Sequence, residues 1–179
     1  EIIDYSRNAR AELDIQEIDF NTLIESTFLE LRYLEKASLI DMRYSIEENG
    51  KLHSDYRRLN VILNNLVSNA IIYHNFYQNQ PFIEVRIVIG QKRTYITIED
   101  NGSGIKEEHL KNIFKMFYRA TEGTTGSGLG LYIVQEALNK LNGKIQVKSK
   151  YGEGTVFEIE VPSLKSKQQN IKPAEELTT

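Results

Sequence analysis

Two stretches of alternating residues constrain the fold of this 179-residue chain more than any other feature. Apolar residues occupy every second position from Ile83 to Ile89, and a similar stretch runs from Tyr95 to Asp100. The short turn at residues 90–93 between them predicts an antiparallel hairpin. Because side chains alternate between the faces of a strand, one face of this hairpin is apolar and must be covered by another layer.

Helices with an apolar stripe are the expected cover. Leu59, Ile62, Leu66 and Val67 recur at helical spacing in the clearest of them. Helical spacing predicts helices over about residues 22–34 (with Asn21 as N-cap), 55–73, 107–114 and 128–142. Alternation predicts further strands over about residues 17–20, 41–47, 145–149 and 155–161. The expected fold is therefore α+β: a two-layer sandwich whose mixed, antiparallel-rich sheet of about five strands carries helices on one face.

All of these elements fall within residues 17–162, which we expect to form one domain. Residues 1–16 are interpreted as the end of a helix, too short and too polar to fold alone. Residues 163–179 are rich in Lys, Gln, Glu and Thr and predict a flexible tail. The chain begins at Glu1 rather than Met, so we expect it to be a piece of a longer protein.

Charge and composition exclude several classes of function. The net charge is −3, which gives no electrostatic basis for wrapping nucleic acid. The absence of cysteine excludes disulfides and thiolate metal sites. No apolar run approaches the roughly 20 residues of a membrane span.

Asp100 is an unexpected residue at the end of its predicted strand. It shares the phase of Ile96 and Ile98, so its carboxylate points toward the helix layer. A buried charge is costly unless a donor satisfies it. Asp100 could simply cap the turn that follows, or it could select a ligand with an amino donor, such as adenine.

Two glycine-rich segments follow Asp100. Gly102 and Gly104 flank one serine, and glycines there allow positive φ and a close approach to a flat ligand. Residues 126–131, at the start of the last predicted helix, would expose backbone N–H groups where the helix dipole favours phosphate. This second segment could instead be a hinge loop with no ligand. Its spacing matches neither a dinucleotide fingerprint nor a Walker loop.

Asn65 and Asn69 lie four residues apart on one flank of the apolar stripe. An amide oxygen at the edge of a pocket is a reasonable ligand for a hard cation such as Mg²⁺. The alternative is two surface amides on a polar helix flank.

These segments, in their order along the chain, resemble the nucleotide-binding domain of histidine kinases, in the Bergerat-fold superfamily that also holds DNA gyrase, mismatch-repair ATPases and a heat-shock chaperone. Residues 65–73 resemble the N-box, 99–105 the first glycine box, 113–119 the F-box and 126–131 the second glycine box. The turn at 152–155 fits as well. The resemblance covers about residues 17–162, and residues 4–7 resemble the end of the second helix of the dimerisation bundle.

The resemblance implies that ATP and Mg²⁺ bind and that the γ-phosphate goes to a histidine on the dimerisation domain. Asn65, Asn69 and Arg119 would be catalytic, with Asn69 holding Mg²⁺. Asp100 would accept from the adenine amine, and Thr155 would reach the base through water. The implied nucleotide-binding set is Asn65, Asn69, Tyr73, Asp100, Gly102, Gly104, Ile105, Phe117, Tyr118, Arg119, Gly126, Ser127, Gly128, Leu129, Gly130, Leu131 and Thr155.

The resemblance also implies a mobile lid from Phe114 and Phe117 to Gly126, anchored on the last helix by Gly126, Gly128 and Gly130. Its centre, about residues 118–125, is polar and flanked by glycine, which favours mobility.

Two departures from the family pattern matter. Ile72 stands three residues after Asn69, where the family often has a phosphate-binding lysine. No histidine is followed at once by an acidic residue, as an acceptor histidine would be. His53, His74 and His109 are therefore expected to be ordinary surface residues.

Three interpretations stay open: the kinase domain, a hydrolysing ATPase or serine-kinase relative, and a degenerate nucleotide binder that signals by contact alone. The hydrolysing relatives carry a glutamate where this chain has Asn65. For the kinase, the expected partners are its own dimerisation and phosphotransfer domain and a response regulator, with no nucleic acid. We expect this chain alone to be monomeric, its parent to be a homodimer, and the location to be the bacterial cytoplasm, with membrane anchorage of the parent left open.

Overall fold

The computed structural model describes residues 12–75, 79–120 and 127–164, and these residues form two layers. The main sheet has five strands in the order β2–β4–β5–β7–β6. Their bounds are β2 Asp41–Glu48, β4 Phe82–Ile89, β5 Arg93–Asp100, β6 Lys144–Lys150 and β7 Gly154–Pro162. β2 pairs with β4 in parallel, and the remaining neighbours are antiparallel. The predicted mixed, antiparallel-rich sheet is confirmed.

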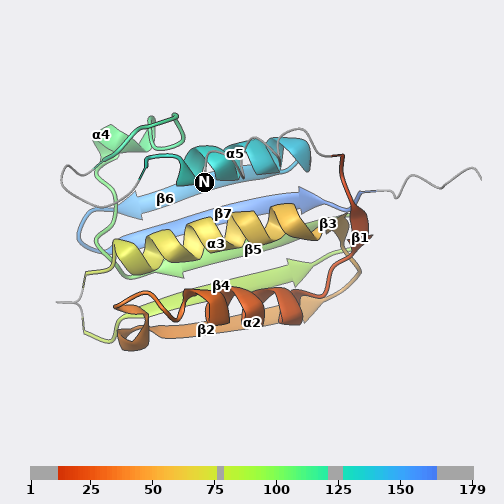
Figure 1. Ribbon diagram of the computed structural model, residues 1–179, viewed down its shortest axis with the longest axis horizontal. Coiled ribbons are helices and arrows are strands. Elements are labelled where there is room, and N and C mark those ends of the chain that lie inside the picture. The colour runs from red at the N-terminus through yellow and green to blue at the C-terminus, as the bar shows by residue number, and fades with distance from the viewer. Residues whose placement is uncertain (1–11, 76–78, 121–126, 165–179) are drawn as a thin grey trace, which may run out of the picture.

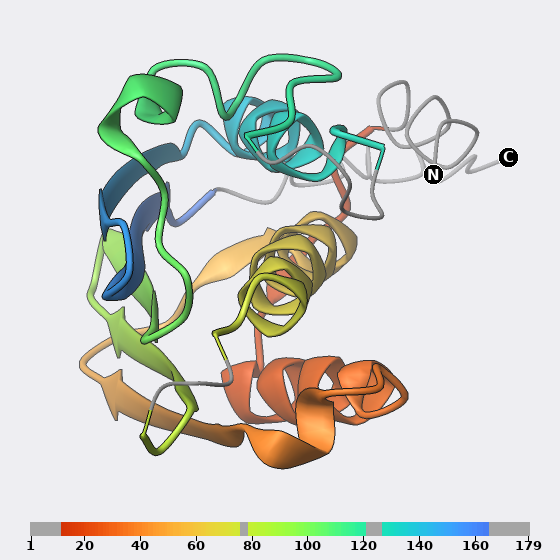
Figure 2. The ribbon, with the colours of Figure 1, turned by 90° about the vertical axis from the view of Figure 1, so that its left-hand side faces the viewer.

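Three helices cover one face of this sheet (Figure 1), and the side view in Figure 2 separates the two layers. They are α2 (Phe20–Leu31), α3 (Tyr56–Ile72) and α5 (Gly130–Lys140). The short helix α4 (Glu107–Leu110) lies next to β6, and the 3₁₀ turn η1 (Ala37–Leu39) leads into β2. Among the described residues, no helix is long and apolar enough to cross a membrane.

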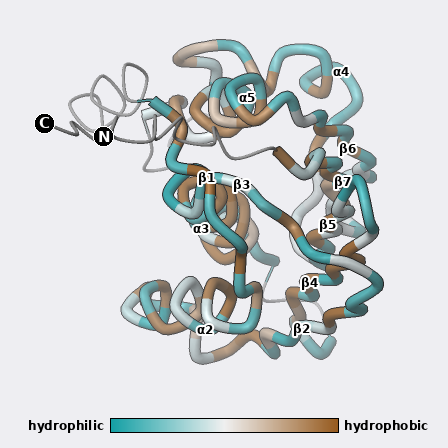
Figure 3. Tube along the Cα trace, turned by 90° about the vertical axis from the view of Figure 1, so that its right-hand side faces the viewer, coloured by the Kyte–Doolittle hydropathy of each residue, from teal (hydrophilic) through white to brown (hydrophobic). Residues whose placement is uncertain are grey.

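The core lies between the layers, where Figure 3 shows hydrophobic residues on both sides of the gap between sheet and helices. α3 contributes the centre of the core: Leu59, Ile62, Leu63, Leu66 and Val67 are fully buried. They pack with the inward residues of β4, β5 and β7, which alternate with exposed or half-buried ones. Burying a side chain of this size stabilises the fold by about 1.5–3 kcal/mol, so α3 is held firmly along most of its length.

The outer face of the sheet is charged. Arg43 on β2 pairs with Glu84 on β4 at 3.1 Å, and Arg86 on β4 pairs with Glu99 on β5 at 2.6 Å. Exposed pairs of this kind stabilise a fold by about 0–1 kcal/mol each. They keep the uncovered face hydrophilic, so the helix layer and its edges are where a ligand site is expected.

A second, two-stranded sheet fixes the start of α3. β1 (Ile15–Glu17) pairs antiparallel with β3 (His53–Asp55), and Asp55 is the N-cap of α3. The Asp55 carboxylate is 1% exposed and accepts from the Arg58 backbone N–H at 3.0 Å, from its guanidinium at 2.5 Å and from the Asp14 backbone N–H at 3.1 Å. The segment that leads into the domain is therefore hydrogen-bonded to the cap of its central helix.

Several boundaries differ from those predicted. Residues 12–14 have no regular structure and residues 15–17 are a strand, so the helix expected to reach residue 16 is wrong there; residues 1–11 lie outside the described residues. α2 is capped by Asp19, which accepts from the backbone of Asn21 and Thr22, and not by Asn21.

The C-terminal boundary of the domain also differs from the prediction. The Ser163 and Leu164 backbone N–H groups donate to carbonyls of Lys92 and His53, because the chain continues along β3 after β7. Residues 163 and 164 are thus part of the domain, and residues 165–179 lie outside the described part of the chain.

Candidate nucleotide-binding site

The ends of several elements meet at one side of the molecule: the C-terminal half of α3, the end of β5, the start of β7 and the start of α5. Asn65 and Asn69 lie on the flank of α3 that faces α5. A Cβ atom on Gly130, the first residue of α5, would lie 2.9 Å from Asn65 Oδ1 and 3.9 Å from Asn69 Nδ2. Glycine at this position therefore lets both asparagines sit against the first turn of α5.

The Asn65 side chain is oriented by its own helix. Its Nδ2 donates to the Val61 carbonyl at 2.7 Å, and its oxygen is the atom that faces Gly130. Asn65 and Asn69 are both half-buried, as predicted for a polar flank beside the apolar stripe. The two amides therefore present polar atoms beside a helix N-terminus, which favours anions.

Asp100 ends β5 and points inward, in phase with the buried Ile96 and Ile98. It accepts from the Gly102 backbone N–H at 2.8 Å, so the predicted turn cap is present. Burial raises the pKa of Asp100 from 3.8 to about 6, and the nearby Glu99 charge adds to this, while backbone N–H groups of Gly102 and Thr155 act in the opposite direction. A carboxylate held in such surroundings gains strongly from a further donor, so capping and ligand selection are compatible roles.

The first glycine box is fastened at several points. The Ser103 backbone N–H donates to the Tyr73 carbonyl at 3.2 Å, and the Gly152 N–H donates to the Ser103 carbonyl at 2.8 Å. Gly104 has a φ of +64°, and a Cβ there would lie 2.1 Å from the Lys150 carbonyl oxygen. The loop is thereby held between the end of α3 and the β6–β7 turn, and no larger residue fits at Gly104.

Thr155 and Ile105 are joined through Ser149 on β6. The Ser149 hydroxyl lies 2.9 Å from the Thr155 hydroxyl and accepts from the Ile105 backbone N–H at 2.7 Å. Thr155 is buried and pairs with Asp100 across β5 and β7. Thr155 and Asp100 therefore lie together at the base of the site. Ser149 belongs to none of the sequence motifs, so it could not be predicted as part of the site. It lies beside Thr155 only because β6 pairs with β7.

The F-box contributes an irregular segment. Phe117 has a φ of +62° and is 60% exposed, and a Cβ on Gly128 would lie 2.8 Å from the Phe117 carbonyl carbon. Tyr118 is half-buried and Arg119 is exposed. The start of the predicted lid therefore lies close to Gly128, one of its predicted anchors, while residues 121–126, with most of the lid centre and Gly126, lie outside the described residues.

The second glycine box differs slightly from the prediction, since α5 begins at Gly130 and not at Gly128. Gly128 has a φ of +71°, and the Leu129 backbone N–H donates to the Ser127 hydroxyl at 3.3 Å. Leu129 is buried and Leu131 packs against the core. Two leucines of the predicted binding set therefore anchor the start of α5 in the core.

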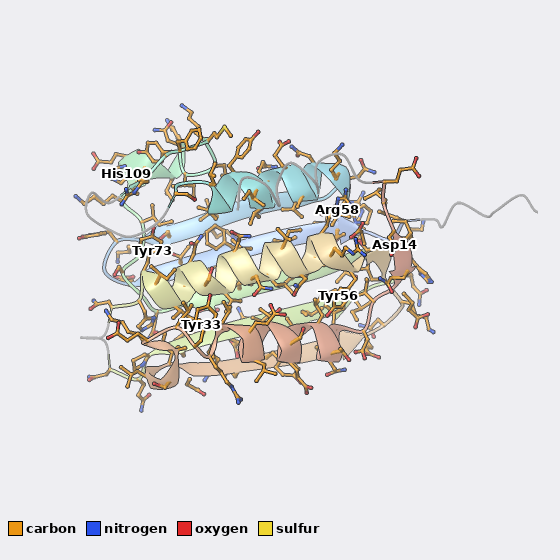
Figure 4. The ribbon with its side chains drawn as sticks, viewed as in Figure 1. Asp14, Tyr33, Tyr56, Arg58, Tyr73 and His109 are labelled. Carbon is orange, nitrogen blue, oxygen red and sulfur yellow. The ribbon has the colours of Figure 1, made fainter. Side chains whose placement is uncertain are left out.

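Tyr73 and His74 end α3 on the side of the site, and Figure 4 shows Tyr73 at the opposite end of the helix from Arg58. Tyr73 is 40% exposed, as a nucleotide contact requires. His74 is only 6% exposed, and its burial lowers its pKa, so the prediction of a surface histidine is wrong for it. His74 backs the first glycine box: a Cβ on Gly102 would lie 3.3 Å from its Cα. The sequence spacing could have predicted this burial, because His74 continues the apolar stripe of Val67, Ala70 and Ile71 at helical spacing.

Comparison with known proteins agrees with this geometry. Residues 54–165 match the family of histidine kinase-, DNA gyrase B-, and HSP90-like ATPases. The chain is 34% identical to the autoinducer 2 sensor kinase/phosphatase LuxQ of Vibrio cholerae over 90% of its length, and 33% identical to the sensor histidine kinase YclK of Bacillus subtilis over 94%. It spans 20% of LuxQ and 36% of YclK, so it corresponds to one part of these relatives.

Solved structures give the same result. The nucleotide-free catalytic domain of the histidine kinase ThkA superposes with a TM-score of 0.70 at 25% identity, over 84% of this chain and 98% of that one. The mycobacterial sensor histidine kinase MprB has the same fold, with a TM-score of 0.71 at 23% identity, over 86% of this chain and all of that one. The chain therefore belongs to the family of histidine kinase-, DNA gyrase B- and HSP90-like ATPases, and it is an ATP-binding catalytic domain of the sensor histidine kinase type.

Proposed function

We propose that this domain transfers the γ-phosphate of ATP to a histidine on the dimerisation domain of its parent protein. The observation that carries the proposal is the placement of Asn65 and Asn69 against the first turn of α5 at Gly130. Amide oxygens and helix N-terminal amides are the groups that a metal-bound triphosphate needs. Asp100, at the other edge of the site, would select adenine.

Asn69 is the residue that would hold Mg²⁺. It is half-buried, lies four residues after Asn65 on the same flank and faces the helix start where phosphates would bind. Mg²⁺ usually takes one or two protein oxygens and completes its shell with phosphate and water, so this sparse donor set fits. When bound, the ion would neutralise charge that develops on the transferring phosphoryl group.

The reaction itself is a displacement at phosphorus. A nitrogen of the acceptor imidazole would form the N–P bond, while the bond from the γ-phosphorus to the bridging oxygen breaks and its electron pair leaves with ADP. The imidazole gives up its remaining ring proton to solvent. For this reaction the domain has to supply position and charge stabilisation, for which Asn65, Asn69 and Arg119 are the candidates.

Hydrolysis is the competing function, and α3 argues against it. Activating a water needs a base within hydrogen-bond reach, and α3 contains no Asp or Glu from Tyr56 to Ile72. Asn65 stands where the hydrolysing relatives carry a glutamate, and an amide cannot accept that proton. Ile72 is 42% exposed at the end of α3, so the family's phosphate-binding lysine has no replacement at this position.

The remaining partners follow from this reaction. We propose that the parent is a homodimer held by its dimerisation helices, that a response regulator receives the phosphoryl group, and that the domain acts in the cytoplasm of a bacterium, where ATP is available. The described domain by itself is expected to be monomeric. Light scattering of this chain checks this, and a dimer that persists on dilution would contradict it.

The experiment uses ATP labelled at the γ-phosphate. The chain is incubated alone and then with a separate dimerisation bundle that carries its histidine. We expect label on the bundle, no label on this chain and little free phosphate. Rapid release of phosphate without transfer would instead support the hydrolysing function.

A further inference from the structure

A side-chain contact joins α4 to the F-box. His109 Nδ1 lies 2.7 Å from the Tyr118 hydroxyl, nine residues further along the chain. The two rings are 6.1 Å apart with 56° between their planes, and Glu108 Oε1 lies 3.6 Å from the other ring nitrogen. His109 is half-buried, so the expectation of an ordinary surface histidine does not hold for it.

The backbone that this contact holds is constrained on both sides. Phe117, just before Tyr118, has a φ of +62°, which is uncommon for a residue with a side chain and persists only where its surroundings enforce it. A Cβ on Gly128 would lie 3.0 Å from both the Phe117 Cα and the Tyr118 carbonyl oxygen. Gly128 therefore lets the main chain of Phe117 and Tyr118 pass close by, while His109 holds the tip of the Tyr118 side chain.

The His109–Tyr118 contact lies next to a residue that is expected to bind phosphate. Tyr118 directly precedes Arg119, the cation expected at the phosphates. His109 lies at the same end of the molecule as Tyr73 (Figure 4). Tyr118 belongs to the nucleotide-binding set that the resemblance implies, and in the structure its hydroxyl bonds to His109.

We propose that His109 is a positioning residue for phosphoryl transfer: it holds Tyr118 and so fixes the path of the chain from Phe117 to Arg119 on the phosphate side of the site. The inference rests on the proposed kinase function. It predicts that losing the His109–Tyr118 bond affects the γ-phosphate and spares adenine, because Asp100 lies on a separate element, β5.

The test compares His109→Leu, His109→Asn, Tyr118→Phe and the double variant His109→Leu/Tyr118→Phe in the full chain. Small misplacements in a site can reduce rates by about 100-fold, so we expect His109→Leu and Tyr118→Phe each to slow transfer to the bundle by roughly tenfold. Binding of ADP by His109→Leu should stay unchanged, and each variant should melt within a few degrees of the wild type. His109→Asn should retain most activity, since its amide occupies the place of Nδ1. The double variant should be no slower than either single one, because both break the same bond.

Calorimetry with ATP and with ADP gives a second reading that does not depend on transfer. The two disrupting variants should reduce the preference for ATP over ADP, and His109→Asn should retain it. If the wild type fails to label the bundle, the kinase proposal fails, while this preference still decides the role of His109. Wild-type rates and ATP preference in Tyr118→Phe, additive losses in the double variant, or an equal loss in His109→Asn and His109→Leu would each overturn the inference.

Discussion

The two ends of α3 place their polar side chains in different surroundings: Asp55 at the N-terminal end is buried, and Asn65 and Asn69 in the C-terminal half are half-buried beside α5. Asp55 accepts from Arg58 and from the Asp14 backbone, while Asn65 and Asn69 face the start of α5. Figure 4 shows Asp14 and Arg58 at one end of the helix and Tyr73 at the other. In the proposed function, one helix thus has two tasks: its first turn fixes the domain, and its last two turns would present groups to the nucleotide. Substitutions at the two ends should therefore affect different properties.

The largest effect on stability is expected from Asp55→Ala. Removing one member of a buried ion pair costs about 3–5 kcal/mol, because the remaining charge loses its partner. Urea unfolding measures the change. Asp41→Ala is the matched control, since Asp41 pairs with Arg43 on an exposed edge and should change the free energy of unfolding by less than about 1 kcal/mol. A similar small change for Asp55→Ala would contradict this assignment of stability to the first turn.

Asn69→Ala should have the opposite effect: it should reduce phosphotransfer and leave stability nearly unchanged. Losing one stabilising group in a reactive site slows the reaction by about 100- to 1,000-fold, and we expect phosphotransfer to fall by this amount while the urea midpoint barely moves. Asn64→Ala is the control on the same helix, because the Asn64 amide donates to Asn60 and Glu30 on the side of α2. Equal activity of the two variants would show that Asn69 does not hold Mg²⁺.

Asp100→Asn should weaken ATP binding about 10- to 100-fold, since a hydrogen bond to a charged acceptor is worth roughly 1.5–3 kcal/mol. Calorimetry with ATP and GTP checks both affinity and base selectivity. Wild-type protein that binds the two nucleotides equally well would remove the basis for this role of Asp100.

The pH dependence of stability gives a separate test of Asp100. Its pKa is raised in the folded protein from 3.8 to about 6, so the folded state keeps a proton that the unfolded state has already lost. Stability from this group is therefore greatest below about pH 4 and falls as the pH rises to about 6. One pKa unit corresponds to about 1.4 kcal/mol, so the loss is roughly 3 kcal/mol. In Asp100→Asn this loss of stability between pH 4 and pH 7 should be absent. If the free energy of unfolding of the variant changes with pH as much as that of the wild type, the pKa of Asp100 is not raised.

Gly130→Ala should change stability only slightly. Alanine favours a helix, but its Cβ would lie 2.9 Å from Asn65 Oδ1, so the Asn65 side chain must move. We expect a melting temperature within a few degrees of the wild type, together with a clear loss of transfer. Unaltered transfer would mean that the close contact of Gly130 with Asn65 is dispensable.

Sequence patterns predicted the elements whose signal is local. The alternation in β4 and β5, the stripe of α3 and the inward phase of Asp100 all follow from residue spacing, and the structure has them as expected. The choice between Asp19 and Asn21 as N-cap could not be made, because both side chains can cap a helix and lie two residues apart.

Features that depend on distant contacts were not predictable. β1 and β3 have three residues each and gain their identity by pairing with each other across about forty residues. The bond between His109 and Tyr118 depends on the turns that bring α4 and the F-box together. The asparagines were found from their spacing, but the role of Gly130 in seating them required the packing of α5 on α3.

The chemical nature of the labelled product shows whether a histidine accepts the phosphoryl group. After incubation of this chain with γ-labelled ATP and a separate dimerisation bundle, the label on the bundle is treated with acid and with alkali. A phosphoryl group on a histidine nitrogen is lost in acid and survives alkali, and this is the result we predict, together with its absence when the histidine is replaced. A label that survives acid and is lost in alkali would identify a serine or threonine ester and contradict the account.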